Sequence, residues 1–467
     1  MEKKNENFLS YRELGVILPK YLQKLNYTHA EIMPLMEHPL DNSWGYQCTG
    51  LYSPTSRYGS LNDLKFLIDE LHKHNIGVIF DWVPGHFCKD IHGLSKFDGS
   101  PTYEYEDEWK ADNKVWGTLN FDLGKPEVRS FLISNAFYWV KEFHLDGIRV
   151  DAVSNMIYFN YESDLNPCVN YCAVDFLKTL NTALLDKFPY IILAAEESTT
   201  WPRVSFKVEE GGLGFNFKWN MGWMNDCLKY IEIDPIFRKY NHEKLTFSML
   251  YNYDEHFILP ISHDEVVHGK LSLLNKMWGD YWNKFAGARL FMAYMIGHPG
   301  KKLTFMGSEI GQFIEWSEDR EIDWDLTDNY DMHKKIQLFV EDINRIYRKE
   351  KSLWELDYSS EGFKWIEPDN KEQSIFIFMR KGNNPQKDIL IFICNFTPVY
   401  YEDYVIGVPY LTDYKEILNS DNSKYGGSGQ TNDDILTAMD KEYHNQRYSI
   451  NLKVPPMGAV ILKIDNK

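Results

Sequence analysis

The chain has 467 residues, of which 44% are hydrophobic and 25% are charged, and this composition excludes a largely disordered protein. Its formal net charge of −18 argues against a nucleic-acid partner, because phosphate binding requires a basic surface. No stretch approaches the roughly eighteen apolar residues of a membrane-spanning helix, and the first ten residues contain no apolar signal core. We expect a cytoplasmic monomer with no nucleic-acid or membrane partner.

From about residue 11 to residue 350, short apolar stretches alternate with amphipathic helical stretches. Helices are predicted at 11–26, 61–75 and 128–144. The strand candidates are 29–35, 77–83, 147–153, 191–197, 215–220, 256–262 and 302–308. This alternation is typical of a parallel sheet wrapped by helices, and a (β/α)8 TIM-type barrel is its closed form.

The pattern changes after about residue 360, where strands follow one another without helices between them. The strand candidates there are 374–381, 388–396, 448–454 and 459–464. We therefore predict a catalytic barrel domain over residues 1–355 and a C-terminal antiparallel β-sandwich over 356–467. The polar stretch 419–434 is expected to be a mobile loop within the sandwich.

The cysteines contain no C-x-x-C pair. Cys168 and Cys172 also lack a second pair that could complete a zinc site. We expect reduced, buried thiols, and we expect neither a metal ion nor a cofactor. The six residues concerned are Cys48, Cys88, Cys168, Cys172, Cys227 and Cys394.

The stretch FHLDGIRVDAV, residues 143–153, reads as a buried strand interrupted by two charged residues. Because strand side chains alternate between faces, Arg149 and Asp151 share one face while Ile148 and Val150 share the other. A buried ion pair is rarely more stabilising than apolar packing, so a purely structural strand gains little from this one. The alternative is a local salt bridge at the strand end.

Ionisable residues follow four of the seven predicted strands, at the end where a barrel carries its catalytic groups. They are Asp81 with His86, Arg149 with Asp151, Glu196 with Glu197, and His263 with Asp264. Each pair has a structural alternative: Asp81 caps a turn, the glutamates are solvated, and Ser262 forms a capping box with Glu265. Their recurrence at one end of four strands favours a functional site.

The candidate site combines carboxylates, an arginine and histidines, and their spacing is not that of metal ligands. Such a set of groups suits chemistry at a glycosidic bond. In such sites one carboxyl group protonates the leaving oxygen while another attacks or activates water. On this reading Asp151 is the nucleophile, and Arg149 favours its ionised form.

Six segments carry a resemblance to a known family: DWVPGHF, GIRVDAV, AAEEST, SHDEVVHGK, DNSWGYQCTGLYSPTSRYG and GFNFKWNMGWMND. Together they resemble the bacterial 1,4-α-glucan (glycogen) branching enzymes of the α-amylase superfamily, glycoside hydrolase family 13. The D-x-V-x-x-H pattern alone indicates only the superfamily, whereas AEEST, SHDEVVHGK and the WGYQ block point to the branching subfamily. The resemblance runs from about residue 8 to the C-terminus.

The resemblance implies a role for each candidate residue. The implied catalytic residues are Asp151 as nucleophile, Glu196 as general acid/base and Asp264 as third carboxylate. The implied substrate-binding residues are Arg149, His86 and His263 in one subsite, Tyr46 stacking on the reacting glucose, and Asp81 supporting the site. Glu197 is a supporting neighbour. The implied reaction cleaves an α-1,4-glucan chain and transfers it to a 6-hydroxyl by a retaining double displacement that needs no metal or cofactor.

Two other functions share most of these residues. An α-amylase-type hydrolase has the same catalytic set, and a glucan-binding protein with little turnover keeps the same pocket. The subfamily segments favour branching over hydrolysis, and the complete catalytic set argues against a binding protein.

The sequence departs from the family pattern at three places. The loop 163–176 after the nucleophile strand is shorter than usual, which bears on the length of the transferred chain. Cys48 stands where a proline is usual. The family's first barrel strand and a preceding carbohydrate-binding module have no counterpart here, because residues 1–10 are too polar and lack strand alternation. We therefore expect a barrel without its first strand, poorly stable and weakly active alone.

Overall fold

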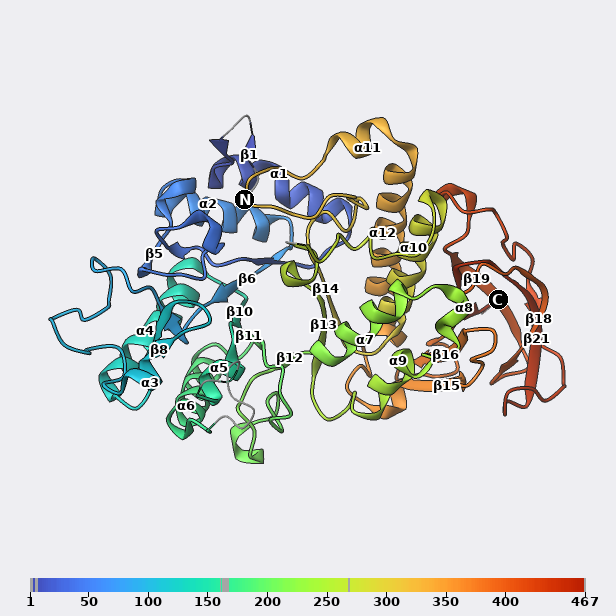
Figure 1. Ribbon diagram of the computed structural model, residues 1–467. Coiled ribbons are helices and arrows are strands. Elements are labelled where there is room, and N and C mark those ends of the chain that lie inside the picture. The colour runs from blue at the N-terminus through green and yellow to red at the C-terminus, as the bar shows by residue number, and fades with distance from the viewer. Residues whose placement is uncertain (1–2, 5–6, 160, 162–167, 268, 466–467) are drawn as a thin grey trace. The chain divides into compact units, whose positions relative to one another are not determined.

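The computed structural model describes residues 3–4, 7–159, 161, 168–267 and 269–465 (Figure 1). The chain forms two compact units. The first unit comprises residues up to Trp219 with Asp254–His256 and Glu318–Glu321; the second comprises Asn220–Tyr253, Phe257–Ser317 and residues from Ile322 onward. Among the described residues, no helix is long and apolar enough to cross a membrane.

Five parallel strands form the centre of the first unit. Their order across the sheet is β12 (Phe217–Trp219), β11 (Ile192–Ala195), β10 (Gly147–Val150), β6 (Gly77–Trp82) and β3 (His29–Ile32). All five fall within predicted strands. In this register Arg149 on β10 is paired with Asp81 on β6 and with Ala194 on β11, so the charged face of β10 meets the carboxylate of the next strand.

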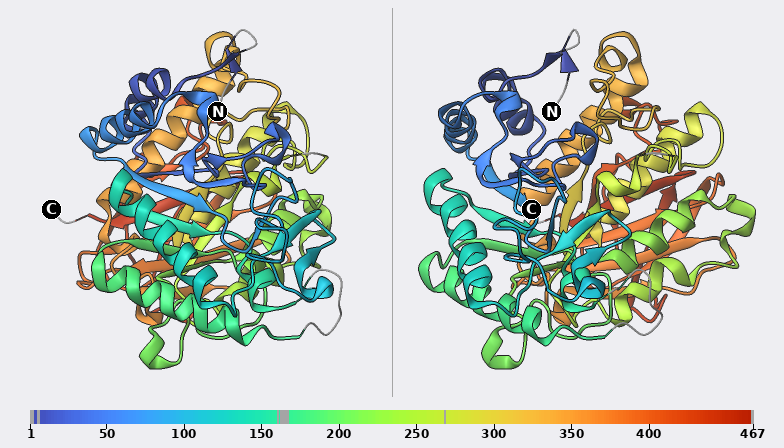
Figure 2. Two further views of the ribbon diagram at one scale, coloured as in Figure 1. Left: turned by 90° about the vertical axis from the view of Figure 1, so that its left-hand side faces the viewer. Right: turned by 60° about the vertical axis from the view of Figure 1, so that its left-hand side comes forward.

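The helices of the first unit form from amphipathic stretches, and several of them begin at a residue that caps the helix N-terminus. They are α1 (Tyr11–Lys24), α2 (Leu61–Lys73), α3 (Glu108–Ala111), α4 (Pro126–Phe143), α5 (Val153–Ile157) and α6 (Tyr171–Lys187), with 3₁₀ turns η1 (Asp41–Ser43), η2 (Ser56–Tyr58) and η3 (Val208–Glu210). Ser10 and Ser60 each close a capping box at the start of α1 and α2. These two helices lie side by side (Figure 2), and the predicted helices 11–26, 61–75 and 128–144 are confirmed.

Short antiparallel strands complete this unit. They are β1 (Lys3–Lys4) with β2 (Asn7–Phe8), β4 (Met36–Glu37) with β5 (Gly50–Pro54), and the set β7 (His86–Phe87), β9 (Thr118–Asn120) and β8 (Asp112–Asn113). β1 and β2 pair with each other in antiparallel fashion and are not part of the parallel sheet, so the described part of residues 1–10 does not supply a strand of that sheet, as expected. Strands of two residues need no alternation, so the pattern criterion misses them.

The second unit contains the other two predicted parallel strands, β13 (Phe257–Ile261) and β14 (Lys301–Thr304), which pair with each other. Its helices are α7 (Met221–Glu232), α8 (Pro235–Arg238), α9 (Glu243–Thr246), α10 (Tyr281–Gly297), α11 (Asp325–Asn329) and α12 (Asp331–Lys349). Its 3₁₀ turns are η4 (Phe247–Leu250), η5 (His263–Glu265), η6 (Lys351–Leu353), η7 (Ser360–Gly362) and η8 (Ser423–Tyr425). All seven predicted parallel strands are therefore present.

The C-terminal part of this unit consists of two antiparallel sheets. The larger has the order β15 (Phe363–Glu367), β16 (Ile375–Lys381), β17 (Ile389–Asn395), β22 (Gly458–Ile464), β19 (Asp413–Asn419) and β20 (Leu436–Thr437); the smaller pairs β18 (Tyr401–Val408) with β21 (Tyr448–Val454). Ile377 and Ile391 of one sheet share a buried core with Ile406 and Ile450 of the other. The predicted sandwich is confirmed, and the sequence pattern missed β15, β18, β19 and β20.

Helix α10 packs directly against the larger sheet. Its residue Gly297 lies so close to Phe378 and Phe392 that a methyl group on its Cα would be 2.7 and 2.8 Å from their rings. Arg289 of the same helix donates its Nε proton to the carbonyl of Ser420 at 2.7 Å. The boundary expected at residues 355 and 356 lies inside this second unit.

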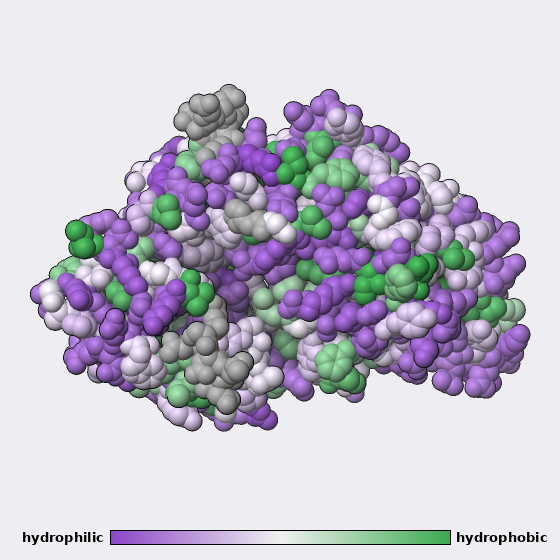
Figure 3. All heavy atoms as spheres, viewed as in Figure 1, coloured by the Kyte–Doolittle hydropathy of each residue, from purple (hydrophilic) through white to green (hydrophobic). Residues whose placement is uncertain are grey.

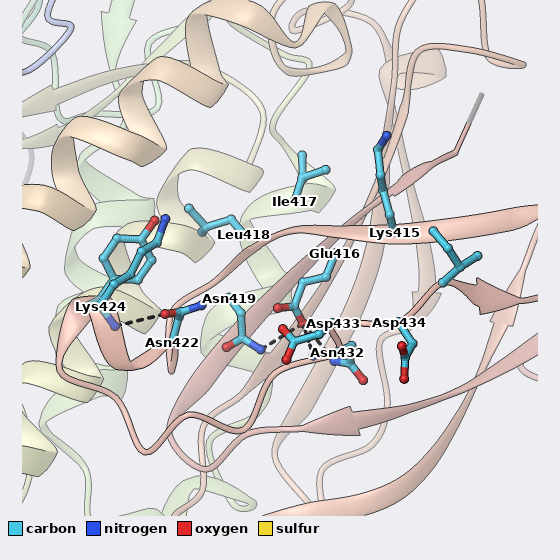
Figure 4. A pocket seen from close by; sticks show the side chains of 12 residues that line it. Lys415, Glu416, Ile417, Leu418, Asn419, Asn422, Lys424, Asn432, Asp433 and Asp434 are labelled. Atoms are coloured by element: carbon cyan, nitrogen blue, oxygen red, sulfur yellow. Dashed lines mark hydrogen bonds between the residues drawn. The ribbon is translucent and has the colours of Figure 1, made fainter. Parts of the chain in front are cut away.

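The segment 419–434 is an ordered turn rather than the loose loop that its composition suggests. The buried carboxylate of Asp421 accepts hydrogen bonds from the Ser428 amide at 2.8 Å and the Gln430 amide at 3.1 Å. A shallow polar pocket of about 250 Å³ lies beside this turn (Figure 4). There Glu416 accepts hydrogen bonds from the side chains of Asn419 and Asn432, so these polar groups satisfy one another.

The cysteine prediction is right for four residues and wrong for two. All six thiols are free; Cys48, Cys88, Cys227 and Cys394 are buried, whereas Cys168 and Cys172 are exposed. Cys168 precedes α6, and Cys172 lies on the exposed side of its first turn, next to the buried Ala173.

Candidate active site

The centre of the candidate site is the carboxyl end of β10. Asp151 follows the strand directly, and its amide donates to the carbonyl of Trp82 on β6 at 2.9 Å. Ala152 then adopts a left-handed conformation, with φ of 49°, and α5 begins at Val153. This abrupt turn holds Asp151 at the strand end, which is where a parallel α/β sheet carries its functional groups.

Arg149 connects three carboxylates at this position. Its Nη1 lies 2.5 Å from Asp81 Oδ1 and 3.0 Å from Asp151 Oδ1, and its Nη2 lies 2.8 Å from Glu196 Oε2. Its side chain is only 1% exposed. Burial opposes the charge on Arg149, but the carboxylates of Asp81 and Glu196 outweigh burial and hold its pKa well above the ordinary value. The alternative considered from the sequence was a local salt bridge between Arg149 and Asp151. That salt bridge is present, but it is one contact of a larger network.

Asp81 and Tyr46 form the second part of this network. The Tyr46 hydroxyl donates to Asp81 Oδ2 at 2.5 Å, and Arg149 Nη1 donates to that hydroxyl at 3.3 Å. Burial and the nearby charge of Asp151 raise the pKa of Asp81 against the opposing effect of Arg149. Both carboxylate oxygens of Asp81 thus contact site residues, so its side chain belongs to the network rather than to a turn cap.

His86 approaches the site from β7. Its Nε2 lies 3.8 Å from Asp151 Oδ2, and its ring centroid lies 4.8 Å from that of Trp116. The imidazole is buried between these two groups. Trp116 was not among the residues predicted from sequence, because its isolated position in a polar stretch carries no periodic signal.

The two consecutive glutamates after β11 have different surroundings. Glu196 Oε2 accepts a hydrogen bond from the amide of Ala152 at 2.9 Å in addition to its ion pair with Arg149. Glu197 is fully buried, with Oε2 at 2.6 Å from the ammonium group of Lys218. Neither side chain is simply solvated, so that structural alternative is wrong.

Trp219 and Lys218 complete the site from β12, and the sequence analysis assigned neither. The guanidinium carbon of Arg149 lies 4.5 Å from the centroid of the Trp219 ring, which is a favourable cation–π geometry. Lys218 reaches Glu197 and also donates to the carbonyl of Thr199 at 3.1 Å. The signal that could have found Lys218 is a charged residue inside an otherwise apolar strand.

His263 and Asp264 belong to the second unit, where they lie on η5 directly after β13. The capping box that the sequence offers as an alternative is present: Ser262 donates its amide to Glu265 Oε2 at 2.8 Å and accepts the amide of Asp264. His263 Nε2 lies 3.4 Å from Asp264 Oδ1. The capping box shapes the turn that presents these two side chains, so the structural and functional readings are compatible.

Two sequence features lie partly or wholly outside the described residues. His268 of the SHDEVVHGK segment is one, and residues 163–167 of the short loop are the other. Within the described ranges, no group of three or more His, Cys, Asp or Glu side chains could hold a metal ion.

The arrangement around Arg149 places two carboxylates, Asp151 and Glu196, at the ends of adjacent parallel strands and on one guanidinium. Paired carboxyl groups of this kind can act as nucleophile and as general acid/base at a glycosidic bond. The Arg149 guanidinium favours the ionised form of a neighbouring carboxylate, which is the form that a nucleophile requires.

Comparison with known proteins places this geometry in a family. Residues 17–118 match the family described as alpha amylase, catalytic domain, and residues 365–465 match alpha amylase, C-terminal all-beta domain. Among solved structures, an α-amylase from Geobacillus thermoleovorans complexed with acarbose has a TM-score of 0.71 at 18% identity, covering 98% of this chain and 92% of that chain. A cyclomaltodextrinase has a TM-score of 0.69 at 17% identity, covering 98% and 71%. The fold is thus that of the α-amylases, a (β/α)8-type barrel with a C-terminal all-β domain.

Curated relatives are much more similar in sequence. The chain is 60% identical over 469 residues to 1,4-alpha-glucan branching enzyme GlgB 1 of Clostridium perfringens strain 13, covering 99% of this chain and 69% of the relative. It is 56% identical to GlgB 2 of C. perfringens strain SM101 and to GlgB of Francisella philomiragia, covering 99% of this chain and 72% and 73% of those proteins. The chain therefore belongs to the 1,4-α-glucan branching enzymes of the α-amylase superfamily.

Proposed function

We propose that this chain is a 1,4-α-glucan branching enzyme of glycogen biosynthesis, which cuts an α-1,4-linked chain and rejoins it through an α-1,6 bond. The observation that carries the proposal is the contact of Arg149 with both Asp151 and Glu196. Relatives that are 56 to 60% identical and carry the branching-enzyme name support the same activity.

Asp151 acts as the nucleophile in the first step. Its carboxylate attacks the anomeric carbon of the donor glucan while Glu196 donates its proton to the leaving 4-oxygen. A glycosyl ester forms on Asp151 and the shortened donor departs with the proton of Glu196. The Arg149 guanidinium stabilises the carboxylate of Asp151 before the attack and again when it is released.

Glu196 acts as the base in the second step. It accepts the proton of a glucan 6-hydroxyl, and that oxygen attacks the same anomeric carbon and releases Asp151. Two inversions retain the α configuration. Because the energy of the original linkage is kept in the ester, the reaction consumes no nucleotide.

The remaining assignments concern the glucose residue at the cut bond. Tyr46 provides a ring that stacks on this glucose, and the hydrogen bond of Tyr46 to Asp81 holds the ring in place. His86, whose Nε2 lies 3.8 Å from Asp151, contacts the sugar hydroxyls next to that carboxylate. From the family pattern we assign Asp264 as the third carboxylate, which holds sugar hydroxyls in the transition state, and His263 as its neighbour.

The proposal extends to partner and location. The partner is a neutral α-1,4-glucan or glycogen, which is compatible with a net charge of −18. We also infer a cytoplasmic monomer, and six free thiols suit a reducing compartment.

The test is incubation of the purified chain with amylose, with three readouts. New α-1,6 anomeric NMR signals, a falling iodine absorbance and a nearly constant number of reducing ends are the expected result. A rise in reducing ends that matches the loss of iodine colour identifies a hydrolase instead. Binding of amylose with no change in any readout identifies a glucan-binding protein. The Asp151→Asn variant is the matched negative control.

A further inference from the structure

A long arm of the first unit, residues 88–117, lies between β7 and β9 and includes α3 and β8 (Figure 1). The strand pairing connects this arm to the candidate active site. β7, which carries His86, pairs with β9, and β9 pairs with β8. Because neighbouring strands lie about 4.8 Å apart, β8 is roughly 10 Å from β7. The start of β8 is therefore held at a fixed position relative to His86.

Trp109 lies on α3, three residues before β8, and is 52% exposed. Its ring centroid is 5.5 Å from that of Phe159, with the rings at 61°. The Phe159 ring in turn contacts Tyr105 at 5.5 Å, and the Tyr105 hydroxyl accepts a hydrogen bond from the amide side chain of Asn170 at 3.0 Å. The exposed indole thus makes an edge contact with a packed aromatic group that holds it in place, and we call Trp109 with Phe159 the platform.

The chain connects Phe159 of the platform to the nucleophile through the segment that follows β10. Phe159 is eight residues beyond Asp151, and α5 occupies five of them. Since a helix rises 1.5 Å per residue and an extended chain about 3.3 Å, the two Cα atoms are at most roughly 20 Å apart. Loops that follow the carboxyl ends of β6 and β10 carry Trp109 and Phe159 respectively, so the platform belongs to the same end of the sheet as Asp151.

The chemistry of this surface favours a glucan. The ammonium group of Lys110 lies 5.3 Å from the Trp109 ring and 2.8 Å from an Asp107 carboxylate oxygen, and the neighbouring Glu106, Glu108 and Asp112 make this segment acidic. An acidic segment disfavours an anionic ligand and is compatible with a neutral one. A broad apolar ring with a polar edge suits a sugar, which has an apolar face and hydroxyls at its rim. Most of the face seen in Figure 3 is hydrophilic, with hydrophobic residues in small separate groups. A half-exposed indole held at the carboxyl end of the sheet is therefore a suitable surface for a sugar ring.

We propose that Trp109, supported by Phe159, is an α-glucan subsite outside the reacting position, and that it influences the length of the chain transferred. The inference rests on the proposed branching function and extends it by naming a specificity residue. A donor chain that reaches from Asp151 past His86 gains a contact on Trp109, whereas a shorter chain does not. Chains long enough to reach the platform are thus held and transferred preferentially.

The experiment compares Trp109→Ala with the unmodified chain on long amylose and on a short malto-oligosaccharide. Products are debranched and the transferred chains are sized by chromatography. We expect the Trp109→Ala profile to shift to shorter chains and its KM for amylose to rise about two- to tenfold, the effect of one aromatic contact. The rate on the short substrate should be unchanged, and Trp109→Phe should restore most of the profile.

Phe97→Ala is the matched control, because Phe97 is 64% exposed on the same arm and contacts Tyr103 instead of the platform. Its profile should equal that of the unmodified chain. The inference is overturned if Trp109→Ala and the unmodified chain have the same chain-length profile and the same KM. It is also overturned if Trp109→Ala loses activity equally on both substrates and has a lower melting temperature, because that result identifies a structural role. If the unmodified chain makes no α-1,6 bonds, the proposed function itself fails.

Discussion

Glu197 and Lys218 form a buried ion pair directly behind the candidate acid/base, with Glu197 Oε2 2.6 Å from Lys218 Nζ. Glu197 follows β11 and Lys218 lies on β12, so the pair connects two adjacent strand ends. Glu197 Oε1 also accepts hydrogen bonds from the Ser154 hydroxyl, beyond the nucleophile, and from the Thr199 amide. The carboxylate thereby joins the loops that carry Asp151 and Glu196.

Glu197→Gln should therefore lower the free energy of unfolding by about 3–5 kcal/mol, because it leaves the Lys218 ammonium buried without a counter-charge. Urea unfolding measures the change. The double variant Glu197→Gln/Lys218→Met should recover a large part of the loss, since it removes both charges. Equal stability of Glu197→Gln and the unmodified chain would show that the ion pair contributes little.

Asp151→Asn and Glu196→Gln should each abolish nearly all branching while the melting temperature changes little. Both residues act in one double displacement, so the loss of either stops the reaction. Glu197→Gln should retain more activity than Glu196→Gln when both are assayed well below their melting temperatures. The reverse order of activities would assign the acid/base role to Glu197.

Gly297→Ala should destabilise the second unit by about 1–3 kcal/mol. The new methyl group would lie 2.7 Å from the Phe378 ring, a distance that forces the helix or the sheet to move. Gly287→Ala is the control on the same helix, because its methyl group would meet Met277 at an ordinary 3.4 Å. It should be neutral or stabilise the chain by up to about 1 kcal/mol through helix propensity. Calorimetry of both variants measures the difference, and equal melting temperatures would contradict the close packing.

Glu31 on β3 should make stability depend on pH. Burial raises its pKa from 4.5 to about 7 against the opposing effect of Arg149. Between these two values the unfolded chain loses the proton of Glu31 and the folded chain keeps it, so the contribution of Glu31 to stability falls as pH rises from 4.5 to 7 and is level above 7.

Glu31→Gln removes this dependence and should be more stable than the unmodified chain at pH 8 by about 1–3 kcal/mol, with little difference at pH 4.5. Urea unfolding at a series of pH values checks it. Glu106→Gln, an exposed carboxyl in the same unit, should leave the pH profile unchanged. A constant difference between Glu31→Gln and the unmodified chain at all pH values would refute the assignment.

Local sequence patterns were enough for the parallel strands and for helices α1, α2 and α4. Each of the seven strands is a short apolar run, and α1 and α2 begin at serines that close capping boxes. Strands such as β18 and β19 were missed because they mix buried and exposed side chains without strict alternation. Their assignment depends on pairing with β21 and β22, which lie far along the chain.

The sequence by itself determined which residue types stand at the strand ends, and therefore that Arg149, Asp151 and Glu196 were candidates, because strand period and the carboxyl-end rule are local properties. Only the tertiary structure decided how they are paired. That Arg149 contacts Asp81 as well as Asp151, that Glu197 is neutralised by Lys218, and that Trp109 rests on Phe159 all depend on strand register and loop packing. The contacts of Arg149 with Asp81, Glu197 with Lys218 and Trp109 with Phe159 join residues 68, 21 and 50 positions apart. A local pattern contains no information about which distant side chain will be a neighbour.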